Sequence, residues 1–176
     1  EGSQLAIRSE FYRNISEILQ TARQNAYRAV NFVMVEAYWN IGRLIAEEEQ
    51  KGKQRADYGT YLIKNLSVRL TEEFGKGFDE REVRRMRQFY QTFLIRDALR
   101  PELTWTHYRL LLRVENYKAR DYYLKEAAEQ NWSSRALERQ INSLYYERLL
   151  KSRNKTPVIK EMKEKTAPLA PTPRDF

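Results

Sequence analysis

The sequence predicts an all-α protein, a multi-helix bundle of about seven helices that includes helix-turn-helix-like units. Apolar residues recur at spacings of three and four over the first 150 residues, and no alternating apolar run bounded by turns indicates a strand. Helix breakers are few, since the 176 residues include six glycines and five prolines, and four of the prolines lie in the last twenty positions. We therefore expect one helical domain over residues 1–150 and a disordered, basic, Pro-containing linker over residues 151–176.

The N-terminal 50 residues contain two predicted helices. The helix over residues 5–22 has one apolar face, whereas the helix over residues 27–50 is apolar on nearly every side. The second pattern is typical of the buried centre of a bundle or of an oligomer. No breaker lies between residues 23 and 26, so the two helices can also form one continuous rod. The apolar face of the first helix comprises Phe11, Ile15, Ile18, Leu19 and Ala22.

Capping residues place the next two helices. Asp57 precedes a helix over residues 58–74, and Gly75-Lys76-Gly77 ends it, because glycine adopts a positive φ at little cost. Asp79 caps the following helix, which runs to about residue 93 or 96, and Glu82 completes a capping-box-like pattern. The inward side chains expected over residues 58–74 are Tyr61, Leu62, Leu66, Leu70 and Phe74.

Three more helices complete the predicted bundle. Thr104 caps a short helix through Leu112, another helix covers residues 117–130, and Ser133 caps the last helix, which runs to about residue 150. The inward side chains expected in this last helix are Leu137, Ile141, Leu144, Tyr145 and Leu149.

Composition excludes most enzyme classes. The chain has no cysteine and one histidine, His107, which excludes disulfides, cysteine-type zinc sites, thiol nucleophiles and His-pair metal sites. No apolar run approaches the ~20 residues of a membrane helix, and no secretory segment occurs, so we expect a cytoplasmic protein with no membrane partner. The 32 Lys+Arg against 24 Asp+Glu give a net charge of +8. We predict a basic binding module with no catalytic residue, metal, cofactor or small-molecule substrate of its own.

The helix that Asp79 caps is the strongest candidate for a DNA-binding surface. Together with the preceding helix and the turn at residues 74–78 it resembles a helix-turn-helix, which lays its second helix in the major groove. Guanidinium groups suit phosphate oxygens and the acceptor edge of guanine, and Gln88 suits adenine. The alternative is a solvated face whose arginines pair with Glu80 and Glu82, or with nothing. The candidate DNA contacts are Lys76, Arg81, Arg84, Arg85, Arg87 and Gln88.

A second unit repeats this arrangement over residues 126–142. A helix, a short turn and the helix capped by Ser133 present Arg135 and Arg139 outward, which adds both to the candidate DNA contacts. Glu138 dilutes the positive charge, so ordinary packing is favoured over DNA contact here. Trp132, in the turn, is interpreted as a core residue.

Three further features are interpreted as structural. His107 is expected to be a surface or capping residue, because no carboxylate lies at a catalytic spacing from it. Glu161-Met162-Lys163 has the Glu-x-Lys spacing of some nucleases, but it lies in the predicted linker with no strand to present it. Most of the twelve tyrosines recur at core spacing, so packing is favoured over base stacking for the majority.

Several sequence blocks, in order along residues 25–150, resemble the N-terminal domain of YhcG-type proteins. They are Tyr38-Trp39-Asn40-Ile41-Gly42-Arg43, Tyr58-Gly59 with Leu66-Ser67, LTEEFGKGF at 70–78, RRMRQFY at 84–90, LTWTHYRLL at 103–111, and Asn131-Trp132-Ser133 with LERQI at 137–141. The resemblance implies a DNA-binding helix-turn-helix module ahead of a C-terminal PDDEXK nuclease domain, which would use Mg²⁺. The catalytic Asp, Glu and Lys of that family have no counterpart here, so we expect no enzyme within these residues and a protein that continues beyond Phe176.

Two functions follow as predictions. The first is the DNA-binding N-terminal module of a modular PDDEXK-type nuclease, which positions DNA for a catalytic domain outside this chain and forms a homo-oligomer, with a dimer favoured. The alternative is an oligomerisation or protein-interaction module without direct DNA contact, which the largely apolar helix over residues 27–50 supports.

Overall fold

A computed structural model describes residues 2–52 and 58–171, with side chains from Ser9 onward. Within these residues the protein is all-α, as the sequence predicts, and it contains eight α-helices and two short 3₁₀-helices. The helices are α1 (Gly2–Lys51), α2 (Tyr58–Phe74), α3 (Glu80–Thr92), η1 (Arg96–Ala98), α4 (Trp105–Leu111), α5 (Tyr117–Glu129), α6 (Ser134–Asn142), α7 (Tyr145–Lys151), α8 (Thr156–Thr166) and η2 (Ala167–Leu169). None of the described helices is both long and apolar enough to cross a membrane.

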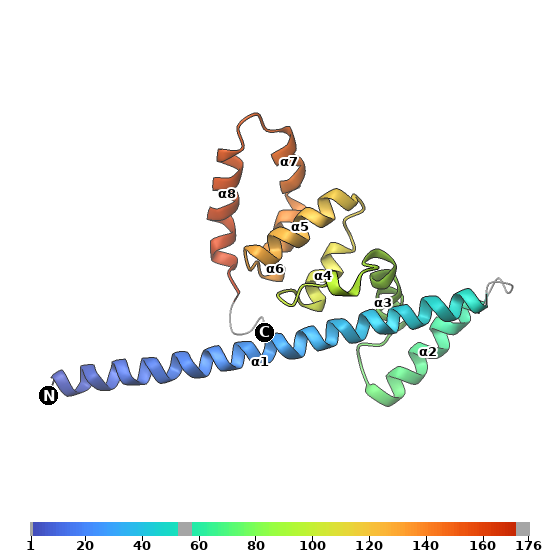
Figure 1. The fold of residues 1–176 in the computed structure, drawn as a ribbon, viewed down its shortest axis with the longest axis horizontal. Coiled ribbons are helices and arrows are strands. Elements are labelled where there is room, and N and C mark those ends of the chain that lie inside the picture. Colours follow the sequence, from blue (N-terminus) through green and yellow to red (C-terminus); the bar gives the residue numbers. More distant parts are fainter. Residues whose placement is uncertain (1, 53–57, 172–176) are drawn as a thin grey trace.

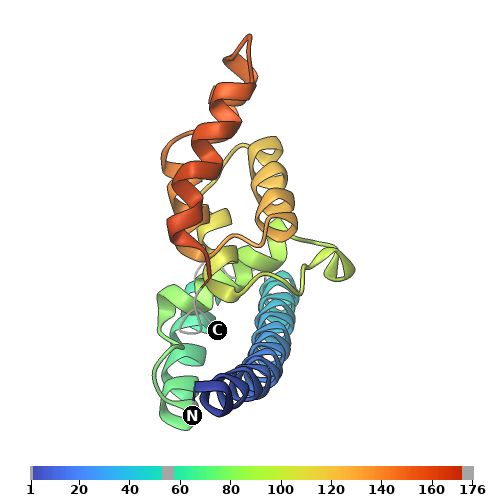
Figure 2. The same cartoon turned by 90° about the vertical axis from the view of Figure 1, so that its left-hand side faces the viewer.

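The first two predicted helices form one continuous rod, α1. Its 50 residues correspond to about 75 Å at 1.5 Å per residue. Figure 1 shows α3 and α4 against the C-terminal half of α1, α2 on its other side, and α5 to α8 stacked farther from α1, while the N-terminal end of α1 extends beyond them. Figure 2, turned by 90°, shows α8 as the helix that rises farthest from α1.

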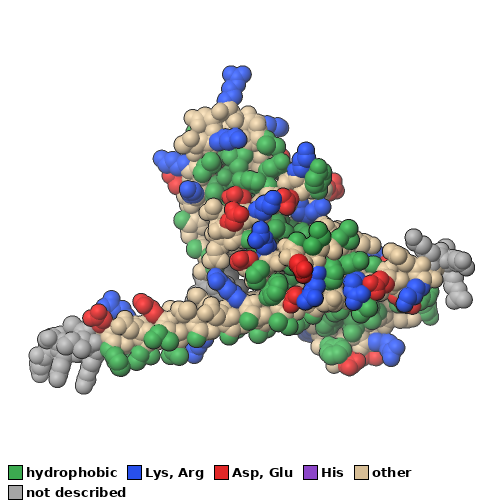
Figure 3. All heavy atoms as spheres, viewed as in Figure 1, with side chains coloured by type: hydrophobic (Ala, Val, Ile, Leu, Met, Phe, Trp, Pro, Cys, Tyr) green, Lys and Arg blue, Asp and Glu red, His purple; other side chains and the backbone are tan. Residues whose placement is uncertain are grey.

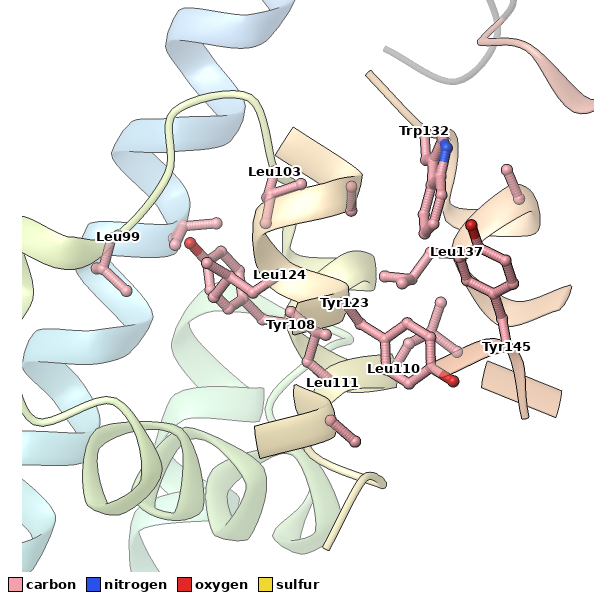
Figure 4. Close-up of a cluster of buried hydrophobic side chains, with 14 of the residues drawn as sticks. Leu99, Leu103, Tyr108, Leu110, Leu111, Tyr123, Leu124, Trp132, Leu137 and Tyr145 are labelled. Carbon is pink, nitrogen blue, oxygen red and sulfur yellow. The ribbon is translucent and has the colours of Figure 1, made fainter. Parts of the chain in front are cut away.

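One hydrophobic core joins α1 to the helices that stand on it. Val35 and Trp39 of α1 are buried with residues of α3 to α7, and the indole Nε1 of Trp39 donates to the carbonyl of Phe93 at 2.6 Å. Figure 4 shows Tyr108, Tyr123 and their apolar neighbours converging from different helices. A smaller cluster of Ile45, Ile63 and Val83 joins α1, α2 and α3. The described helices are therefore held together around α1.

A glycine allows α3 to lie directly on α1. A Cβ added to Gly42 would lie 2.0 Å from the carbonyl oxygen of Met86, which is backbone and cannot move aside. The absence of a side chain at this position thus lets the two helices approach closely, and Val83, Met86 and Phe89 are buried beneath α3.

The last predicted helix is two helices, which corrects the prediction of an unbroken helix from Ser133 to about residue 150. The break occurs at Leu144, which has a left-handed φ of 52° and is 57% exposed rather than inward. The hydroxyl of Tyr123 accepts a hydrogen bond from Tyr146 N at 3.1 Å and so satisfies one free N–H at the start of α7. A tertiary contact therefore stabilises the second helix start.

The prediction of a disordered linker is wrong for residues 156–169, which form α8 and η2. Pro157 lies in the first turn of α8, where its missing N–H has no intrahelical partner to lose. Met162 is only 5% exposed, Arg148 of α7 pairs with Glu161, and the Ser133 hydroxyl donates to the carbonyl of Leu169. Residues 172–176 and the predicted cap Asp57 lie outside the described residues.

Several predicted inward positions are exposed. Residues 27–50 are not the buried centre of this chain, because Val30, Val33 and Leu44 are 61%, 61% and 57% exposed. Tyr61 and Phe74 of α2 are also exposed, because α2 packs through Ile63 and its neighbours instead. Tyr145, Leu137 and Trp132 are buried as predicted.

Candidate nucleic-acid interface

The turn between α2 and α3 has the backbone geometry that its glycines predict. Gly75 and Gly77 have φ values of 83° and 111°, a region that disfavours residues with a side chain. The carboxylate of Asp79 then accepts a hydrogen bond from Glu82 N at 2.9 Å and caps α3. Lys76 is exposed between the two glycines. The turn thus places one cation beside the N-terminus of α3.

The outward face of α3 contains three of the candidate DNA contacts. Arg81, Arg84 and Gln88 are exposed, and their spacing of three and four places them on one side of the helix. Arg84 Nη2 lies 2.6 Å from Glu80 Oε2, and the two side chains are 46% and 40% exposed. Exposed pairs of this kind contribute little free energy, so a phosphate can replace Glu80 as the partner of Arg84.

Arg85 belongs to a less exposed charge cluster between α3 and α4. Its guanidinium pairs with Glu82, whose other neighbours are Arg109, at 3.5 Å, and the indole N–H of Trp105, at 3.3 Å. The side chains of Arg85 and Glu82 are only 20% and 14% exposed. Burial and the charge of Glu82 raise the pKa of the nearby Tyr38. Glu82 therefore links α3 to α4, and Arg85 is a half-buried partner of Glu82 on the same helix.

Arg87 faces α1. Its Nη1 pairs with Glu49 Oε1, with side chains 30% and 19% exposed, and its Nε is buried without a hydrogen-bond partner among the described residues. The pair links residues 38 positions apart along the chain. Of the six candidates around α3, the structure thus brings Lys76, Arg81, Arg84 and Gln88 to the surface. It leaves Arg85 half-buried in an ion pair within α3 and turns Arg87 toward α1.

The second predicted unit, α5 and α6, presents a more mixed surface. Arg135 is exposed and Arg139 half-buried, and Glu138 between them pairs with Arg113 at 3.3 Å. A shallow groove of about 490 Å³ runs along this face, lined by Arg135, Glu138, Arg139, Asn142, Ser143 and Leu169. The carboxylate of Glu138 thus lies between the two arginines, and the interpretation of this unit as mainly a packing element stays a prediction.

A third basic surface, on α7 and α8, was missed as a folded feature. Lys151, Arg153, Lys155, Lys163 and Lys165 are exposed there. The hydrogen bond from Arg148, followed by the charges of Arg148, Lys165 and Arg139, holds the pKa of Glu161 below its usual range. The spacing of Val158, Met162 and the preceding Pro157 is the sequence signal that could have revealed α8.

Comparison with known proteins identifies the family. A profile of the DUF1016 N-terminal domain matches residues 14–148, which is more than half of the chain. The chain belongs to this family. It is also 34% identical over 184 residues to "Putative nuclease YhcG" of Escherichia coli (strain K12). That alignment covers 86% of this chain and 49% of the relative, so the chain spans about half the length of that curated protein. No solved structure shows significant similarity.

The DUF1016 match includes two of the three basic surfaces. It contains α1 from residue 14 onward, the whole of α3 and the whole of α6, and it ends at residue 148 within α7. The basic end formed by α7 and α8 therefore lies largely outside the matched region. The predicted candidates on α3 and α6 all lie inside it.

The acidic residues and His107 do not form a metal-binding cluster in the part of the chain that the structure describes. Within the described ranges, no group of three or more His, Cys, Asp or Glu side chains could hold a metal ion. The Mg²⁺ that the resemblance implies concerns the nuclease domain outside this chain and stays a prediction. His107 is a capping residue, as one of the two interpretations held, but it is buried at 5% exposure and not on the surface. Glu161 and Lys163 lie on a helix, where Glu161 pairs with Arg148.

Proposed function

We propose that these helices bind duplex DNA through the outward face of α3 and the turn before it. In this proposal they hold DNA for a metal-dependent nuclease domain of the PDDEXK type, and the cutting step belongs to that domain. The observation that carries the proposal is the cluster of Lys76, Arg81, Arg84 and Gln88 on one exposed surface that follows a helix and a tight turn. Membership of a family with a relative named as a nuclease supports it.

The chemistry of this cluster suits a nucleic acid. Guanidinium and ammonium groups neutralise phosphates and release counterions, which produces affinity that falls as salt rises. Gln88, one turn from Arg84, can make paired hydrogen bonds to the edge of adenine. Val83, Met86 and Phe89 hold the opposite side of the helix in the core, so the outward side chains project from a rigid support.

The test compares two double variants that remove the same charge. Arg81→Ala/Arg84→Ala removes two outward cations of α3, and Arg96→Ala/Arg113→Ala removes two exposed cations elsewhere, each paired with a glutamate as Arg84 is. Alanine is a better helix former than arginine, so α3 is expected to stay folded, which circular dichroism checks. Binding to a fluorescent duplex is measured across a salt series.

The proposal predicts that the two double variants change the salt dependence of DNA binding by different amounts. Loss of two phosphate contacts should flatten the slope of log K against log salt by about 1.8 in Arg81→Ala/Arg84→Ala. The matched variant should change the slope by clearly less. Equal slopes for both variants, or a parent protein without affinity for duplex DNA at low salt, would refute the outward face of α3 as the contact. The basic end of α7 and α8 would then be examined with Lys163→Ala/Lys165→Ala.

An interaction module remains the second candidate function. It rests on a separate observation, which is the length of apolar surface that α1 leaves exposed.

A further inference from the structure

Helix α1 has two apolar faces that point in opposite directions. Val35, Trp39 and Ile45 form the face that is buried against the other helices, with exposures of 0%, 6% and 3%. Phe11, Ile18 and Val33 lie on the other face, with exposures of 65%, 68% and 61%. At 3.6 residues per turn these two sets lie roughly half a turn apart around the helix axis. A single chain therefore buries only one of the two apolar faces.

The exposed face follows an eleven-residue repeat, in which four positions of each repeat face the same way. We call this set the α1 stripe. An eleven-residue period corresponds to about 3.67 residues per turn, close to that of a straight helix, so the stripe stays on one side over about 50 Å. Its members are Phe11, Ile15, Ile18 and Leu19; Ala22, Ala26, Ala29 and Val30; Val33, Ala37, Asn40 and Ile41; and Leu44. Asn40 is the only polar member, and none is charged.

The described part of the chain leaves most of the stripe uncovered; the exceptions are Ala37, Asn40 and Ile41, which are half-buried, and Ile41 packs against the smaller core cluster. Every side chain described from residue 9 to residue 27 is exposed, except those of Ser16 and Gln24, which are half-buried. Figure 3 shows hydrophobic side chains along the edge of α1 that faces away from the body of the molecule. A water-exposed apolar surface of this length is unusual for a monomer and marks an interaction site.

We propose that the α1 stripe is the interface of a homodimer in which two copies of α1 pack against each other along their length. A second copy fits because it offers an apolar stripe of the same length and the same straightness, as a two-fold interface requires. Ala22, Ala26 and Ala29, the three small residues of the middle repeat, allow the two helices to approach closely. Charges lie beside the stripe rather than within it, as at the seam of paired helices.

The area of exposed apolar surface on the α1 stripe also suits a homodimer. Seven large side chains of the stripe, namely Phe11, Ile15, Ile18, Leu19, Val30, Val33 and Leu44, are each more than 40% exposed. Covering them on two copies removes on the order of 1,200 Å² of accessible surface, where stable specific interfaces begin. Helices α3 to α8 stand on the opposite face of α1, and α2 lies only beside its C-terminal end, so the stripe is open to a partner over the N-terminal part of α1. The proposal does not depend on DNA binding.

The first test measures mass by sedimentation equilibrium, without DNA, at tens of micromolar protein. Ile18→Glu/Val33→Glu places two charges on the stripe, at side chains that make no core contact in one chain. Arg13→Glu/Gln20→Glu is the matched control, because both residues are exposed on the other side of the same helix. The parent and the control should be dimers and the stripe variant should have half their mass, with helical circular dichroism retained. A monomeric parent, or a stripe variant that stays dimeric, overturns the proposal.

The second test is independent of any loss of folding. The chain has no cysteine, so a single introduced thiol reports on one position. Ala26→Cys should form a covalent dimer on mild oxidation, because facing residues of paired helices lie within disulfide reach, whereas Glu17→Cys on the other side should not. Ile15→Cys then distinguishes a parallel pair, in which it also crosslinks to itself, from an antiparallel pair, in which it does not. Equal crosslinking of Ala26→Cys and Glu17→Cys contradicts the proposal.

Discussion

The imidazole Nε2 of His107, in α4, lies 2.8 Å from the carbonyl oxygen of Trp132, in the turn before α6. The other ring nitrogen, Nδ1, accepts a hydrogen bond from Thr104 N at 3.1 Å as part of a capping box. Because Nδ1 accepts, Nε2 must be the protonated nitrogen and donates to Trp132. One neutral histidine thus caps a helix and fixes a turn 25 residues away.

We expect His107→Ala to lower the free energy of unfolding by about 2–4 kcal/mol. The change removes a cap and a buried hydrogen bond, and it leaves the carbonyl of Trp132 without its partner. Chemical denaturation followed by circular dichroism measures the effect. The control is Thr106→Ala, one residue earlier and exposed, which should change stability by less than about 0.5 kcal/mol. Equal stability of the two variants would show that the His107 contacts carry no net free energy.

Gly42→Ala is expected to destabilise the protein although alanine is the better helix former by about 1 kcal/mol. Its Cβ would overlap the backbone of Met86, so α1 and α3 must separate and loosen the core at Val83 and Phe89. We expect a loss of more than about 2 kcal/mol in the free energy of unfolding.

The matched control for this change is Gly59→Ala in α2. There the nearest atom is the flexible carboxylate of Glu49, at 3.0 Å, so the side chain can give way. Gly59→Ala should be neutral or stabilising. If Gly42→Ala were as stable as Gly59→Ala, the close approach of α1 and α3 would not be needed for the fold.

The buried tyrosines predict a loss of stability at alkaline pH. Burial raises the pKa of Tyr108 to about 12 and that of Tyr123 also to about 12, from about 10 in an unfolded chain. Between pH 10 and 12 the unfolded chain releases phenolic protons that the folded chain retains. The stabilisation is therefore complete below pH 10, and the free energy of unfolding falls as pH rises through this window.

Tyr108→Phe tests this pH dependence directly. The variant also loses the hydrogen bond that the Tyr108 hydroxyl accepts from Arg100 N at 2.8 Å, so it should be about 1 kcal/mol less stable at pH 8. Its stability should nevertheless decline less steeply between pH 10 and 12. Tyr61→Phe, at an exposed tyrosine, should leave the slope unchanged. A parent-like slope in Tyr108→Phe would mean that this phenol does not control the transition.

Docking of α8 should depend on Met162. Truncation to alanine leaves a cavity beneath α8, and we expect the free energy of unfolding to fall by about 2–3 kcal/mol. Limited proteolysis in the segment between α7 and α8 should also become faster. Ile159→Ala, on the same helix but 36% exposed, is the control and should change both measurements less. Unchanged proteolysis of Met162→Ala would contradict a role for this side chain in holding α8.

Local interactions explain why much of the helical pattern could be predicted. Asp79 and Ser133 each accept a hydrogen bond from an N–H three residues ahead, and Gly75 adopts a positive φ that favours glycine. These contacts involve neighbouring residues, so spacing in the sequence reveals them. The break at Leu144 could not be found in this way, because the hydroxyl that supports the start of α7 comes from Tyr123, on another helix.

The same difference between local and tertiary contacts applies to the candidate DNA-binding surface on α3. Helical periodicity alone predicts that α3 has an arginine-rich side opposite Val83, Met86 and Phe89, because it separates the two sets of residues around the helix. Which arginines stay outward depends on the packing of distant segments, because Glu49 lies 38 residues from Arg87 along the chain and beside it in space. Likewise, the apolar pattern of α1 is visible in the sequence, but which apolar face is buried depends on where the other helices pack. Ion pairing and burial between distant segments are set by folding, and spacing along one chain does not encode them.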